Sequence, residues 1–195
     1  QEYAAYGYDY PSAGTRLKML EESLIIYKKM TTEDFATFKG EHYEINEAIN
    51  QPKPLQKPHP PLWVCGGGEK VTLKLLAKYG DYGNWDVDVE GFISKSEILK
   101  QHCDTENRNY EEIGRTLHTN VIIGNDQSDL NNKLEKISND TGIPKDIFLK
   151  KPLVGVKNEV FDKIDEFESH GCVYLISYIA DIVWGDTLDI LKEKL

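Results

Sequence analysis

Apolar residues recur every three or four positions in six stretches of the chain, which is the spacing of one helix face. These stretches predict helices over residues 14–30, 71–80, 90–106, 126–139, 157–169 and 187–194. Short apolar runs between them predict strands over residues 62–65, 82–85, 117–124 and 172–177. Two further short strands within residues 35–45, on either side of Lys39-Gly40-Glu41, are expected to form a hairpin.

The order of these elements predicts the fold class. After the first helix and the hairpin, strand and helix alternate four times, which is typical of parallel strands joined by right-handed crossovers. Four strands are too few to close a (β/α)8 barrel, which takes about 250 residues. The pattern therefore predicts a single α/β domain over residues 1–195, built on an open parallel sheet or on half of a barrel. Residues 140–156 are expected to be irregular, and the tyrosine-rich residues 1–12 to form an ordered loop.

The charge of the chain narrows the classes of partner. The 195 residues carry a net charge of −10, from 23 Lys and Arg against 33 Asp and Glu. An acidic protein is a poor partner for nucleic acid or for an anionic membrane surface. No apolar run approaches the roughly 18 residues that a membrane-spanning helix needs, and no secretory signal leads the sequence. We therefore expect neither nucleic acid nor a membrane as a partner.

The three cysteines, Cys65, Cys103 and Cys172, lie far apart and lack C-x-x-C spacing. Reduced thiols in a cytoplasmic protein are the expected state. The five histidines show no paired spacing, so no metal site is assigned. The chain begins at Gln1 without an initiator methionine, as in a processed or truncated piece.

The most informative stretch is PPLWVCGGGEK, over residues 60–70. Its apolar run is typical of a strand buried on both faces, and a helix is predicted directly after the glycines. Glycines let a ligand approach the main chain closely, and a helix N-terminus presents unpaired N–H groups that suit phosphate. Gly66, Gly67 and Gly68 therefore predict an anion site for a phosphorylated cofactor. The alternative is a plain turn from strand to helix.

Several longer strings resemble one known family. They are AAYGYDYPSAGTRLKMLEESL, TFKGEHYEI, NQPKPLQKPHPPLWVCGGGEKVTLKLLAKYGDYGNW and the late GxxYLISYIAD. In this order they resemble the luciferase-like monooxygenase family over nearly the whole chain. The most specific part lies between the prolines and the glycines, and the nearest branch is the one that depends on coenzyme F420, a deazaflavin.

This resemblance implies a TIM barrel whose flavin sits at the carboxyl ends of the strands. The predicted strands 62–65, 82–85, 117–123 and 172–177 would be strands five to eight, with the hairpin as a small insertion. Strands one to four would precede Gln1, so the chain is expected to be the C-terminal half of the barrel. Much of the family's ring-binding and catalytic contact comes from the strands that precede it.

The implied function is that of an oxidoreductase or monooxygenase that uses FMN or coenzyme F420. Such a protein transfers hydride, or activates oxygen, for reaction with a small organic substrate. The alternative is a non-catalytic, flavin-binding half barrel that acts by self-association. An open half barrel leaves two strand edges and an apolar face uncovered, which predicts a homo-oligomer, expected to be a dimer.

The resemblance also assigns roles to individual residues. The three glycines would bind the cofactor phosphate, and Lys70 would add a positive charge, with an exposed surface lysine as the alternative. Asn84 and Trp85 end a strand where a barrel presents functional side chains, so both are candidates for cofactor contact; core packing is the alternative for Trp85. A candidate substrate pocket, for which a structural role is the alternative, is formed by Tyr6, His118, Asn120 and Tyr178. No catalytic residue is assigned.

Overall fold

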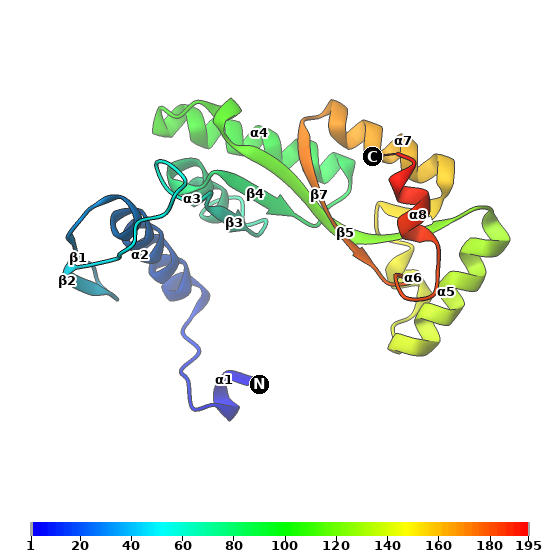
Figure 1. The fold of residues 1–195 in the computed structure, drawn as a ribbon, viewed down its shortest axis with the longest axis horizontal. Coiled ribbons are helices and arrows are strands. Elements are labelled where there is room, and N and C mark those ends of the chain that lie inside the picture. Colours follow the sequence, from blue (N-terminus) through cyan, green and yellow to red (C-terminus); the bar gives the residue numbers. More distant parts are fainter. Residues whose placement is uncertain (1, 195) are drawn as a thin grey trace.

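The computed structural model describes residues 2–194 and is built around a five-stranded parallel sheet (Figure 1). Its strands are β3 (Trp63–Cys65), β4 (Tyr82–Trp85), β5 (Gly114–Gly124), β6 (Leu153–Val156) and β7 (Cys172–Ile179). Strand β5 is central, since β4 and β7 pair with its first half and β6 and β7 with its second. Val121 pairs with both β6 and β7, which places these two strands on opposite edges of β5.

Of the α-helices within residues 2–194, six lie where the apolar spacing predicts them, and the two of four residues each lie outside those ranges. The helices are α1 (Glu2–Ala5), α2 (Ala13–Thr32), α3 (Thr72–Tyr79), α4 (Val89–Glu106), α5 (Gln127–Thr141), α6 (Lys145–Phe148), α7 (Lys157–Ser169) and α8 (Thr187–Lys192), with a 3-10 turn at Tyr110–Glu112. The side chains of Ser12, Asp88 and Asp126 cap α2, α4 and α5 by accepting backbone N–H hydrogen bonds. The α/β class with a parallel sheet is therefore confirmed.

Helices α3, α4 and α7 cover one face of the sheet, which forms the main core. Val64, Trp85 and Leu117 point into this core from β3, β4 and β5, and each is at most 3% exposed. The Trp85 ring meets Phe92 of α4 edge to face at 5.3 Å, and Phe92 meets Phe167 of α7 at 5.6 Å. Burial of such side chains contributes about 1.5–3 kcal/mol each to folding, so this layer fixes the position of the strands.

Two segments differ from the sequence-based expectation. Residues 153–156, expected to be irregular, form β6, because Leu153 and Gly155 are buried beside the end of β5. The strand forms because β5 extends to Gly124 and offers an edge for pairing, which no local pattern indicates. Residues 2–5 form the helical turn α1 rather than part of a loop, and Figure 1 shows this turn at the end of an extended segment, away from the sheet.

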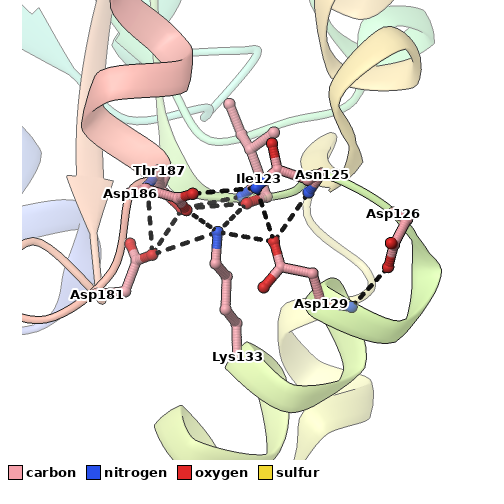
Figure 2. Close-up of polar contacts among 8 residues, drawn as sticks. All are labelled: Ile123, Asn125, Asp126, Asp129, Lys133, Asp181, Asp186 and Thr187. Atoms are coloured by element: carbon pink, nitrogen blue, oxygen red, sulfur yellow. Dashed lines mark hydrogen bonds and ion pairs between the residues drawn. The ribbon is translucent and has the colours of Figure 1, made fainter.

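Lys133 of α5 is the centre of a polar network that joins α5, the end of β5 and the segment between β7 and α8 (Figure 2). Its side chain is only 6% exposed. The ammonium group donates to the Ile123 carbonyl at 2.5 Å and to the Asp186 carboxylate. Asp129 and Asp181 lie 3.4 and 3.9 Å from the same nitrogen. A single buried cation thus holds three carboxylates together.

The carboxylates of this network have further donors. Asp181 is fully buried, and one of its oxygens accepts the Thr187 hydroxyl at 2.8 Å. Asn125 donates to Asp186 at 3.0 Å (Figure 2). The hydrogen bond from Lys133 holds the pKa of Asp186 below its ordinary value, against the opposing effect of desolvation. The network therefore anchors the segment that follows β7 to the end of β5.

The hairpin of β1 (Ala36–Lys39) and β2 (Glu44–Ala48) is attached to α2 by one carboxylate. Glu22 accepts backbone N–H hydrogen bonds from Glu41, His42 and Tyr43 at 2.8 to 3.0 Å. Desolvation would raise the pKa of Glu22, but the three donors outweigh it and the pKa lies below its ordinary value of about 4.5. The hairpin thus depends on an ionised Glu22.

We expect Glu22→Gln to loosen the hairpin at neutral pH, because an amide offers one accepting oxygen in place of two. A group with a lowered folded pKa stabilises above its ordinary pKa, and this contribution is lost as the pH falls through the folded value. Exchange of the Tyr43 amide should therefore be faster in the variant at pH 7, and the difference between the two proteins should shrink as the pH falls below about 4.5. Glu44→Gln, which removes an exposed partner of Lys39, is the control. Equal exchange at pH 7 would contradict the expectation.

Candidate functional site

The glycine loop, residues 66–68, leaves the carboxyl end of β3 and lies fully on the surface. Gly66 has φ +113°, a conformation that side chains rarely adopt, and its N–H donates to the Asn84 carbonyl at 3.3 Å. The loop therefore runs alongside the end of β4. The N–H groups of Gly67 and Gly68 donate to no acceptor within residues 2–194. They remain available to a ligand from solvent.

The carbonyl side of this loop is held by α4. Lys95 donates to the Gly67 carbonyl at 2.9 Å, and His102 Nε2 lies 2.8 Å from the Glu69 carbonyl. No motif in the sequence marks either side chain as part of the site. They are seven residues apart, which is two helical turns and so one face of α4. Because the carbonyl groups of Gly67 and Glu69 are directed towards α4, the N–H groups of Gly67 and Gly68 remain free for an anion.

A shallow groove of about 380 Å³ runs beside the loop. It is lined by Leu17 of α2 and by residues 67–72. Lys70 is exposed in this groove and forms no ion pair among the described residues, so its charge is available. Glu69, the nearby carboxylate, lies 3.8 Å from the Lys95 ammonium, which offsets its charge. Free N–H groups and a free lysine fit a phosphate group.

Four of the predicted residues share one face of the sheet, opposite the helices. Because paired residues of neighbouring strands lie on the same face, Asn84 is beside Thr116 of β5, and Asn120 is beside Tyr178 of β7. His118 lies between Thr116 and Asn120 along β5, and its ring is 5.2 Å from the Tyr178 ring. The polar groups therefore form a line across the face from the glycine loop to β7.

We call this surface the open face; it consists of Cys65, Asn84, Thr116, His118, Asn120, Ile176 and Tyr178. Tyr178 is 63% exposed on it. The face ends beyond Asn120, because Ile122 packs instead into a second core with Leu134 of α5 and Phe148 of α6. The structure thus places Asn84, His118, Asn120 and Tyr178 on one sheet face, with His118 against Tyr178 and with Asn84 at the end of β4 beside the glycine loop.

Three aromatic side chains pack against one another at the other end of this sheet face. Trp63 and Tyr82, the first residues of β3 and β4, stack at 4.5 Å with an interplanar angle of 13°. Tyr174 of β7 meets both rings edge to face at 6.0 and 6.1 Å. These side chains are partly exposed, but they make their contacts with one another. We therefore regard them as packing residues at the amino ends of the strands.

Two predicted residues are not part of the open face. Trp85 belongs to the helix-covered core, which was the alternative for this residue, because adjacent positions of a strand point to opposite faces and Asn84 takes the open one. Tyr6 is 78% exposed and follows α1, outside the group that the open face brings together. Neither residue is placed to contact a ligand on this face.

Two of the three thiols lie away from the open face and are poorly reactive. Burial raises the pKa of Cys103 and of Cys172, which makes both poor nucleophiles at neutral pH. Cys65 is exposed on the open face, and all three cysteines are free.

Among residues 2–194, no cluster of His, Cys, Asp and Glu suited to a metal ion is present. No helix within the same residues is long and apolar enough to cross a membrane.

A family model described as luciferase-like monooxygenase matches residues 1–161. The chain belongs to this family. Among curated members and relatives, it is 30% identical over 81 residues to an FMNH2-dependent dimethylsulfone monooxygenase of Pseudomonas putida, covering 42% of this chain and 22% of that protein. It is 28% identical over 126 residues to an F420-dependent glucose-6-phosphate dehydrogenase of Kineococcus radiotolerans, covering 63% and 36%.

Solved structures show the same fold at low sequence identity. An F420-dependent secondary alcohol dehydrogenase superimposes with a TM-score of 0.77 at 15% identity, over 96% of this chain and 63% of the other. A monooxygenase from Streptomyces bottropensis gives a TM-score of 0.73 at 16% identity, over 100% and 64%. This chain thus spans less than two fifths of the length of these curated relatives, and slightly under two thirds of the length of the two solved chains.

Proposed function

We propose that this chain is part of a luciferase-like oxidoreductase that uses FMN or coenzyme F420, and that its glycine loop binds the cofactor phosphate. The observation that carries this proposal is the geometry of the loop: the N–H groups of Gly67 and Gly68 are free, while side chains of α4 contact the carbonyl groups of Gly67 and Glu69. The N–H groups of Gly67 and Gly68 would donate to the phosphate oxygens, and Lys70 would add a mobile positive charge.

The rest of the cofactor would lie along the open face. Asn84 is next to the loop and suits the polyol portion, whereas His118, Asn120 and Tyr178 lie further along β5 and β7 and suit the ring or the substrate. When bound, the cofactor supplies hydride transfer or oxygen activation. The side chains of this chain orient the cofactor and a small organic substrate, and exclude water from the apolar parts of the face.

We also infer that β3, β4, β5 and β7 correspond to strands five to eight of a TIM barrel, within one domain over residues 1–195. The greater length of the matched structures supports this inference. An uncovered face that includes Ile176 and Tyr178 supports a homodimer in solution. Three free cysteines are compatible with a cytoplasmic protein. The relatives named above are all enzymes, which favours an oxidoreductase over a non-catalytic binding protein.

Anaerobic titration with FMN and with coenzyme F420 tests the proposal directly. We expect quenching of cofactor fluorescence that saturates with one of the two, and competition by inorganic phosphate, because the loop binds the phosphate end. Riboflavin, which has the ring of FMN without its phosphate, is the matched control ligand and should bind at least about tenfold more weakly, as the loss of one or more charge-assisted hydrogen bonds predicts. Equal affinity for FMN and riboflavin, or binding of neither cofactor, would remove the proposed phosphate site.

A further inference from the structure

Thr116 is the one fully buried polar side chain on the open face. Its hydroxyl oxygen lies 2.9 Å from the Gly83 carbonyl oxygen and 2.9 Å from Asn84 Oδ1. The hydroxyl proton is thus shared between a main-chain and a side-chain acceptor, both on β4. Thr116 therefore connects the beginning of β5 to the amide group that ends the open face beside the glycine loop.

This contact determines which end of the Asn84 amide faces a ligand. Because Oδ1 accepts from Thr116, the Nδ2 group is directed away from Thr116, and it forms no hydrogen bond within residues 2–194. Asn84 is half-buried, and its carbonyl accepts the N–H of Gly66 at 3.3 Å. A free amide donor therefore belongs to the residue whose main-chain carbonyl holds the first residue of the glycine loop.

We propose that Thr116 is a positioning residue that fixes the Asn84 amide as a hydrogen-bond donor to an oxygen-rich part of the ligand, a phosphate or polyol oxygen. This inference rests on the proposed function, since it concerns the same site. Without the Thr116 hydroxyl, the amide rotates freely and presents either its donor or its acceptor. The ligand then loses part of one hydrogen bond and must order the side chain on binding.

Replacement of Thr116 with valine removes the hydroxyl and keeps the shape of the side chain, whereas serine keeps the hydroxyl. We expect Thr116→Val to weaken the binding of FMN or F420 about fivefold, as the loss of one neutral hydrogen bond predicts, and Thr116→Ser to restore it. Thr119→Val is the matched control, because Thr119 is a buried threonine of β5 whose hydroxyl has no partner. It should leave the affinity unchanged. Equal losses for Thr116→Val and Thr119→Val would overturn the inference.

A second measurement examines the Asn84 amide without any cofactor. In the ligand-free protein, the Nδ2 resonances of Asn84 should report a rigid side chain in the wild type and in Thr116→Ser, and a mobile one in Thr116→Val. Asn84→Asp exchanges the donor for an acceptor and should weaken cofactor binding at least about tenfold. A rigid amide in Thr116→Val, or full affinity in Asn84→Asp, would overturn the inference. If the wild type binds neither cofactor, the proposed function fails, while the amide resonances still decide the role of Thr116.

Discussion

Gly67→Val is expected to reduce the affinity for FMN or coenzyme F420 at least about a hundredfold. Hydrogen bonds to a charged group contribute about 1.5–3 kcal/mol each, and a branched side chain on the loop obstructs two N–H donors at once, so about 3 kcal/mol or more is lost. Gly67 has no positive φ, and a Cβ added there would meet only the flexible end of Lys95, at 3.0 Å. The fold should therefore tolerate the substitution. Fluorescence titration beside a thermal melt measures both effects.

Two further variants identify the cause of such a loss. Gly14→Val is the matched control, because a Cβ on Gly14 would meet nothing closer than the Ser12 hydroxyl at 4.0 Å. It should leave cofactor affinity unchanged. Lys95→Met releases the Gly67 carbonyl without obstructing the N–H groups, so we expect it to weaken binding by only several-fold. If Lys95→Met reproduced the whole loss, valine would be acting by displacing Lys95, and the N–H groups would have no role in binding.

The positions of the strands and of the glycine loop followed from local pattern. Four apolar runs, each followed by a stretch with helical spacing, predict parallel βα units from local sequence alone. Three successive glycines after such a run predict an accessible backbone, and Gly66 does take a positive φ there. The family resemblance then supplied the ligand class, which no spacing rule contains.

Orientation across the sheet was harder to predict. Adjacent strand residues point to opposite faces, so Asn84 and Trp85 could not both face the ligand, but alternation does not say which one does. The helices decide this, because Phe92 of α4 covers the side of Trp85. Similarly, β6 exists because β5 extends to Gly124 and leaves an edge for Leu153 to pair with, which is a tertiary effect.

The spacing of apolar residues in α5 already marks Lys133 as a buried position. It occupies an apolar position of α5, between Leu130 and Leu134 on the stripe that continues to Ile137. A lysine on such a stripe is normally excluded unless a partner is buried with it. Two of its carboxylate partners, Asp181 and Asp186, lie beyond the part of the chain that the family model matches. Only the folded structure brings the two regions together.

We expect Lys133→Met to destabilise the protein by about 3–5 kcal/mol, the usual cost of removing one partner from a buried ion pair. Methionine fills the space of the lysine stem but leaves the Ile123 carbonyl without its donor and the buried Asp181 carboxylate without a cation. For a chain of this length, such a loss lowers the melting temperature by roughly 10 °C. Chemical unfolding monitored by circular dichroism measures the change in free energy.

Lys136→Met is the matched control for this prediction, because Lys136 is on the same helix but about half exposed, with the exposed Asp140 carboxylate at 3.4 Å and the centroid of the Trp184 ring at 4.8 Å from its ammonium group. It should cost at most about 1 kcal/mol.

The pH dependence of the stability difference between wild type and Lys133→Met gives an independent check. The pKa of Asp186 is lowered by Lys133, so this part of the stabilisation is complete above its ordinary value of about 3.8 and is lost as the pH falls below it. The gap between wild type and Lys133→Met should therefore narrow in acid. A gap that stays constant down to pH 3 would mean that Lys133 acts through packing of its stem, and that the carboxylates of Figure 2 do not depend on its charge.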